Sequence, residues 1–117
     1  MKNNLKDRTK AFALNIWKLC SDFPKSREYN AYVNQLIRCS SSVGANYRAS
    51  QRAKSRADFI NKLKIVEEEI DESMYFLELL IETIENNQTE IKSLHSEAGE
   101  ILAIIVSSIK TARTNGK

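Results

Sequence analysis

One stretch of the chain decides the fold: residues 55–87 read SRADFINKLKIVEEEIDESMYFLELLIETIENN. Apolar residues recur in it every three or four positions over about seven turns, which is the spacing of one face of an α-helix. Ser55 and Asp58 stand at its start, where each side chain can accept a hydrogen bond from a free backbone amide. The pair Asn86-Asn87 suits a helix stop. The pattern predicts a long helix over 56–85, with a stripe of Phe59, Leu63, Val66, Ile70, Met74, Leu77, Ile81 and Ile84.

Outward from this stretch, three more segments show helical periodicity, and we expect helices at 5–21, 26–48 and 90–110. Pro24 separates the first two, because the residue before a proline is pushed out of the helical region. The tail 111–117 has no apolar pattern and is expected to fray. No strand pattern competes, and short links place consecutive helices side by side. The sequence therefore predicts one all-α domain over 1–117, an antiparallel up-down-up-down four-helix bundle.

The composition is that of an ordinary globular protein: 117 residues, 42% hydrophobic and 28% charged. No run approaches the roughly 20 apolar residues of a membrane span, and no signal-peptide pattern is visible. We therefore expect a cytoplasmic protein with no membrane partner. Cys20 and Cys39 lack a CxxC spacing and are expected to be reduced packing thiols.

The long predicted helix carries more apolar surface than one stripe requires. Ile65, Phe76, Leu79 and Leu80 lie on an arc beside the main stripe. A wide apolar band suggests a further partner, and a second copy of the chain is the natural one. We expect these four residues to form an oligomer interface. The alternative is that long bundle helices simply bury wide stripes.

Two carboxylates, Glu69 and Glu72, interrupt that apolar arc, which is costly unless they are paired. The helix at 26–48 offers partners, because Gln35, Arg38 and Asn46 align on one of its faces. We expect a buried polar network in which Arg38 pairs with Glu69 or Glu72, while Gln35 and Asn46 add hydrogen bonds. The alternative is a solvated flank without fixed pairs.

The charge of the chain is divided into two halves. Residues 1–66 hold 14 Lys/Arg against four Asp/Glu, whereas residues 67–117 hold four Lys/Arg against 11 Asp/Glu. Six cations lie between positions 48 and 64 with Asp58 as the one acid. They are the candidate nucleic-acid-binding residues Arg48, Arg52, Lys54, Arg56, Lys62 and Lys64. The alternative is a basic face that neutralises the acidic face of the long helix or of a neighbouring subunit.

An enzyme is not indicated. A di-metal bundle site requires Glu-x-x-His motifs, but the single histidine, His95, has Lys92 three positions before it. No Gly-rich phosphate loop and no nucleophile with a nearby base are evident. We expect no catalytic residues, no metal and no cofactor.

The chain also resembles a known family in many ordered positions. These are Phe23-Pro24-Lys25, Tyr29, Gln35-Leu36-Ile37-Arg38, Ser42-Val43-Gly44-Ala45-Asn46, Arg48, Ser55-Arg56-Ala57-Asp58-Phe59, Lys62-Leu63 and the run from Glu69 to Leu80. The pattern resembles the 23S rRNA intervening-sequence protein family over roughly residues 10–110, most densely over 23–80. One departure is Ala49, where the family often has an acidic residue.

The resemblance implies a four-helix bundle that assembles into a ring-like homopentamer without known enzymatic activity. A distant relative, the accessory protein of diversity-generating retroelements, implies binding of RNA and of a protein through basic surfaces. Together with the charge pattern, this favours a non-enzymatic oligomeric module that binds structured RNA, or DNA, through its basic surface. The alternative is a structural scaffold for an unidentified protein partner.

Overall fold

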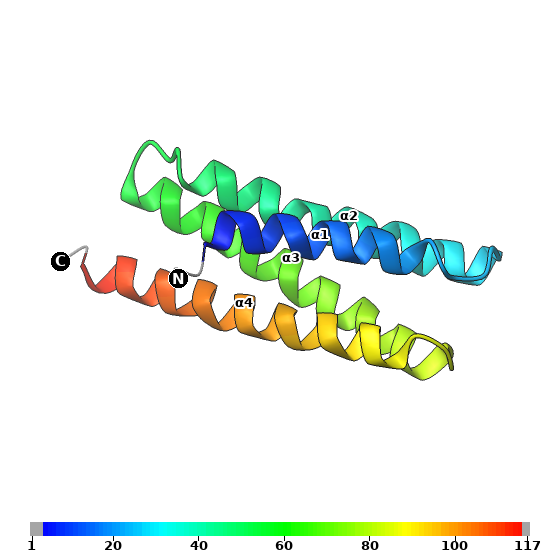
Figure 1. Ribbon diagram of the computed structural model, residues 1–117. Helices are drawn as coiled ribbons and strands as arrows, with labels where there is room; N and C mark the ends of the chain where they lie inside the picture. Colours follow the sequence, from blue (N-terminus) through cyan, green and yellow to red (C-terminus); the bar gives the residue numbers. More distant parts are fainter. Residues whose placement is uncertain (1–3, 116–117) are drawn as a thin grey trace.

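The computed structural model describes residues 4–115 and consists of four α-helices (Figure 1). They are α1 (Leu5–Cys20), α2 (Arg27–Ser50), α3 (Arg56–Thr83) and α4 (Gln88–Thr114). No strand occurs between residues 4 and 115. The predicted all-α fold with four helices is confirmed.

The helices lie side by side along an elongated body of 50 × 29 × 20 Å. In Figure 1, α1 runs from left to right, α2 returns, α3 runs to the right and α4 returns. Helix α2 packs against α1 and α3, and α4 packs against α3 and α1. The start of α1, the α2–α3 turn and the end of α4 consequently share one end of the body (Figure 1).

One hydrophobic core runs the length of the body. Its fully buried side chains come from all four helices, for example Phe12, Leu36, Leu63 and Ile101. Each such side chain stabilises the fold by about 1.5–3 kcal/mol. The α3 stripe contributes to this core, although its members Phe59, Met74 and Ile81 are only partly buried.

The start of α3 is built as its sequence predicts. Ser55 Oγ accepts a hydrogen bond from the Asp58 amide at 3.0 Å, and Asp58 Oδ2 accepts one from the Lys54 amide at 3.0 Å. Both side chains thus satisfy backbone donors that a helix start would leave free.

Several helix ends differ from the prediction, by one to four residues. Helix α3 stops at Thr83, and Asn87 adopts a left-handed conformation with φ 64° just before α4 begins. Helix α4 continues to Thr114, so a frayed tail from residue 111 is wrong for the described part; residues 116 and 117 lie outside it. Thr114 Oγ1 donates to the Lys110 carbonyl at 2.9 Å, which supports this last turn without any apolar stripe.

Both cysteines are free and buried, as the sequence predicts. Burial raises the pKa of the Cys20 thiol to about 11. Since the thiolate is the reactive form, Cys20 is poorly nucleophilic at neutral pH. Between residues 4 and 115, no helix is long and apolar enough to cross a bilayer.

Candidate nucleic-acid interface

The turn between α2 and α3 gathers most of the candidate cations at one end of the bundle. Ser50 closes α2 by donating its hydroxyl to the Tyr47 carbonyl at 2.6 Å, and Ser55 opens α3 five residues later. The chain reverses within this short segment. The side chains of Arg48, Arg52, Lys54 and Arg56 are all exposed around it.

Lys62 is the exception among the six predicted residues. Its ammonium group lies 2.7 Å from Asp58 Oδ1 and is partly buried, so it is held by an acid of its own helix. This hydrogen bond and the Lys54 amide lower the pKa of the Asp58 carboxyl. The remaining candidate, Lys64, is exposed on α3. The predicted set therefore contains five exposed cations and one that is already paired.

The fold adds cations that the sequence analysis did not include. Lys6 and Lys10 stand in the first two turns of α1, and Lys110 and Arg113 in the last two turns of α4; all four are exposed. They reach the same end of the body because α1 begins there and α4 ends there (Figure 1). The predicted up-down-up-down arrangement could have identified these four cations. In such an arrangement, the start of the first helix and the end of the last helix lie at the same end as the α2–α3 turn.

Arg8, in contrast, does not belong to this free basic surface. Its guanidinium lies 2.6 Å from Glu97 and 3.0 Å from Glu100 of α4. The hydrogen bond that Arg8 donates to Glu97 is the main cause that raises the pKa of Arg8. Arg8 links α1 to α4 and is neutralised by two carboxylates.

The opposite end of the body is acidic. Glu78, Glu82 and Glu85 are exposed on the last turns of α3, or just after it, and Glu90 stands in the first turn of α4. Glu78 Oε2 lies 2.8 Å from His95 Nε2. Four exposed cations, Lys18, Lys25, Arg27 and Lys92, also lie at this end. The charge division seen along the chain is therefore only partly reproduced along the long axis of the bundle.

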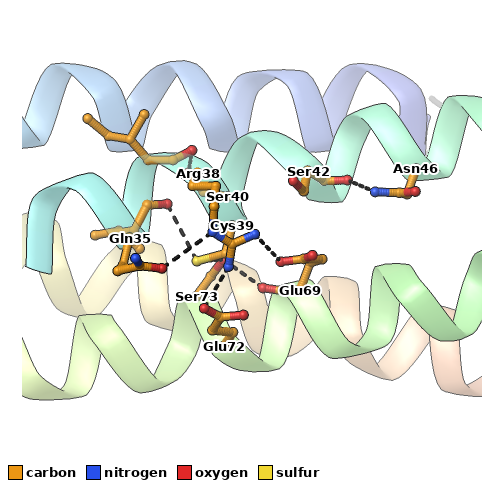
Figure 2. Close-up of polar contacts among 11 residues, drawn as sticks. Gln35, Arg38, Cys39, Ser40, Ser42, Asn46, Glu69, Glu72 and Ser73 are labelled. Carbon is orange, nitrogen blue, oxygen red and sulfur yellow. Dashed lines mark hydrogen bonds and ion pairs between the residues drawn. The ribbon is translucent and has the colours of Figure 1, made fainter.

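Arg38 contacts both predicted carboxylates, between α2 and α3 (Figure 2). Its Nη2 donates to Glu72 at 2.7 Å, its Nη1 to Glu69 at 3.4 Å and its Nε to Gln35 at 3.4 Å. The Glu72 hydrogen bond is the main cause that raises the pKa of Arg38.

The prediction of a buried network is nevertheless wrong in two respects. The Arg38 side chain is 48% exposed, so the cluster lies at the surface. Asn46 is not part of it, because its amide donates instead to the Ser42 carbonyl one turn back on α2 at 2.9 Å (Figure 2). A guanidinium at the end of a long side chain reaches water from a position next to the core, which the periodicity of the sequence does not reveal.

The predicted oligomer residues are also divided. Leu80 is fully buried in the core of its own chain and is not available for an interface, which corrects that part of the prediction. Ile65 is 40% exposed, and Phe76 and Leu79 are half-buried. Phe76 packs edge-on against Tyr75, whose ring centroid is 5.5 Å away.

Other exposed apolar side chains were missed by the sequence analysis. Tyr75 extends the apolar surface of α3, Val106 lies on α4, and Leu14 and Trp17 lie on α1, where Trp17 is 61% exposed. The sequence analysis did not predict this exposed surface, because these residues lie outside the apolar stripes that it used. Among the described residues, no group of three or more His, Cys, Asp or Glu could hold a metal ion.

Comparisons with known proteins bear on the family. No curated protein matches the chain significantly. The chain is similar to a crystal structure of a protein of unknown function from the S23 ribosomal protein family of Bacteroides thetaiotaomicron, with 36% identity and a TM-score of 0.84. The match covers 92% of this chain and 99% of that one. The family model described as 23S rRNA-intervening sequence protein matches residues 1–107. The chain therefore belongs to the 23S rRNA-intervening sequence protein family.

Proposed function

We propose that this protein is a non-enzymatic, cytoplasmic RNA-binding module that acts through the basic end of its antiparallel bundle. The observation that carries the proposal is the gathering of exposed cations around the α2–α3 turn. Arg48, Arg52, Lys54 and Arg56 lie within nine residues of one another, and no carboxylate in residues 4–115 forms an ion pair with any of them. Long cationic side chains in such an arrangement suit a phosphate backbone.

The proposed recognition depends on phosphates and on the shape of the RNA, not on its sequence. Base stacking requires exposed aromatic rings. At the basic end, Tyr47 and Phe59 are both partly buried against the core. Helix ends also lack the extended sheet surface on which bases are commonly read. Affinity should therefore vary little with sequence and fall steeply with salt.

We further propose that the bundle assembles into a ring-like homopentamer. The exposed parts of Ile65, Tyr75, Phe76 and Leu79 on α3 supply an apolar surface for a neighbouring copy. In a ring, the basic ends of five copies add together, and binding several phosphate segments at once raises the overall affinity. The pentamer is the assembly implied by the family resemblance.

The test is fluorescence anisotropy of a labelled RNA hairpin over a range of salt concentrations. The test variant replaces Arg48, Arg52, Lys54 and Arg56 with Gln. The matched control replaces four exposed cations at the opposite end, Lys18, Lys25, Arg27 and Lys92, with Gln, so that net charge falls equally. We expect the test variant to lose roughly 100-fold in affinity and the control far less.

Two results would contradict the proposal. If the wild-type protein does not bind the hairpin even at low salt, the chain is not an RNA-binding module of this kind. If both variants lose affinity equally, binding follows net charge and not the basic end. Measurement of the molecular mass in solution tests the assembly separately, and the mass of a monomer would contradict the pentamer proposal.

A protein-partner scaffold is the second candidate, and the exposed Trp17 and Leu14 on α1 favour it. Tryptophan is enriched among residues that dominate protein interfaces. Pull-down from the native host with wild type and with Trp17→Ala discriminates the two functions. A specific partner lost in Trp17→Ala, together with absent RNA binding, would replace the first proposal by this one.

A further inference from the structure

The seam between α1 and α2 is unusually close near the basic end. A Cβ atom added to Gly44 of α2 would lie 3.2 Å from Thr9 Oγ1 of α1, tighter than ordinary packing. Thr9 itself is fully buried, and its hydroxyl donates to the Lys6 carbonyl at 3.2 Å. A glycine inside a helix costs about 1 kcal/mol relative to alanine. Its presence here is explained by the close approach of the two helices.

A groove of about 580 Å³ lies along this seam. Its lining includes small residues, with Ala13 from α1 and Ser41, Gly44 and Ala45 from α2. Because these side chains are short, they leave a hollow at the surface of the seam.

Cations stand on both walls of this groove. Lys6 and Lys10 line it from α1, four residues apart on one face, and Arg48 lines it from α2. Among residues 4–115, none of the three forms an ion pair, and Asp7 is the single acid that lines the groove. The three cations outnumber the one carboxylate, which leaves a net charge of 3 − 1 = +2 around the groove.

We propose that this groove binds the phosphodiester backbone of the RNA, as a track that leads from the basic end along the α1–α2 seam. The inference deepens the proposed function and rests on it. Lys6 and Lys10 are spaced by about 6 Å along α1, so they suit a chain of successive phosphates better than one compact anion. Arg48 belongs both to the groove and to the α2–α3 turn, which makes the two surfaces continuous.

The first experiment places a carboxylate in the lining of the groove. Ala45→Glu is compared with Ala31→Glu, a matched control, because both alanines are exposed on α2 and only Ala45 lines the groove. With the labelled RNA hairpin at low salt, we expect Ala45→Glu to bind about tenfold more weakly than Ala31→Glu. Equal affinities of the two variants would overturn the groove proposal.

A second variant guards against a folding defect in the first. Lys6→Gln with Lys10→Gln changes two exposed side chains of the groove and leaves the close contact between Gly44 and Thr9 unchanged. We expect the slope of log affinity against log salt to become shallower by about two, since each phosphate contact contributes roughly one. An unchanged slope would overturn the groove proposal.

The outcomes separate this inference from the function on which it rests. Suppose that the variant at Arg48, Arg52, Lys54 and Arg56 loses binding while the Lys6–Lys10 variant does not. This result would support RNA binding by the basic end and contradict the groove proposal. If the wild-type protein binds no hairpin at all, both the proposed function and the groove proposal are wrong. Thermal unfolding followed by circular dichroism verifies that every variant is folded.

Discussion

The two ends of the bundle are built from similar helices but differ in charge and in the way their turns are closed. At the α2–α3 turn, Ser55 and Asp58 cap the helix through contacts within four residues of sequence. At the α3–α4 turn, Asn87 has no capping hydrogen bond from its side chain. There the Gln88 amide reaches back to the carbonyls of Ile81 and Ile84.

In both turns, a side chain in the first turn of the following helix reaches back to the backbone. Asp58 accepts from the Lys54 amide just before α3, whereas Gln88 donates to carbonyls at the end of α3. The basic turn is therefore closed by capping the helix that begins there, and the acidic turn by bonding the carbonyls of the helix that ends there. Four predictions, in order of decreasing effect, test the comparison.

The largest effect concerns charge. Arg52→Glu with Arg56→Glu inverts two cations of the basic turn and should weaken hairpin binding by about 100-fold or more at moderate salt. Glu82→Lys with Glu85→Lys, at the acidic end, should strengthen binding by less than about fivefold, because those positions lie far from the proposed contacts. Anisotropy measures both. Opposite changes of equal size would mean that the ends are equivalent for binding and would break the comparison.

The next effect concerns the cap of α3. Ser55→Ala removes the hydroxyl that accepts from the Asp58 amide and should lower the free energy of unfolding by about 1 kcal/mol. For a domain of this size, the melting temperature should fall by about 4 °C. Calorimetry measures it, and an unchanged melting temperature would show that water replaces this cap without cost.

The third effect has the opposite sign and lies at the acidic end. Asn87 has φ 64°, a region that glycine adopts without strain. Asn87→Gly should therefore leave the free energy of unfolding unchanged or raise it, and the increase should not exceed about 0.5 kcal/mol. Chemical denaturation provides the measurement. A clear loss of stability would indicate that the Asn87 side chain has a role that its hydrogen bonds do not show.

The smallest effect depends on pH. The Lys62 hydrogen bond and the Lys54 amide lower the pKa of Asp58 in the folded protein. A carboxyl with a depressed folded pKa contributes stability above its unfolded pKa of about 4 and loses it as pH falls through the folded pKa. Asp58→Asn should thus be less stable than wild type at neutral pH and equal to it at strongly acidic pH. Melting curves at both pH values test this, and a constant difference would contradict it.

The fold was largely predictable because helical periodicity is a local property. The stripe of α3 and its Ser55–Asp58 start were both visible in the sequence, and the structure confirms them. The ends were less predictable. Helix α2 continues past Arg48 to Ser50 because the buried Ser50 hydroxyl closes its last turn. Helix α4 continues past Lys110 although the apolar stripe on which its end was predicted stops there.

The sequence predicted that the candidate site is a cluster of cations, but not which cations in it are free of an ion pair. Arg48, Arg52, Lys54 and Arg56 are neighbours in sequence, so they are neighbours in space. Lys62 has a spacing of four from Asp58, a distance at which helical side chains pair, and that spacing could have removed it from the free cations.

Sequence alone determined four helices, their buried stripes and a chain divided into a basic and an acidic half, since each of these depends on spacing along the chain. The tertiary structure decided which charges remain free. Lys6 and Lys10 lie at the basic end and remain free. Arg8, which stands between them in sequence, is neutralised by Glu97 of α4, a residue distant in sequence. The physical reason is that a charge pairs with whatever lies within a few ångströms, and only the packing of helices distant in sequence fixes those neighbours.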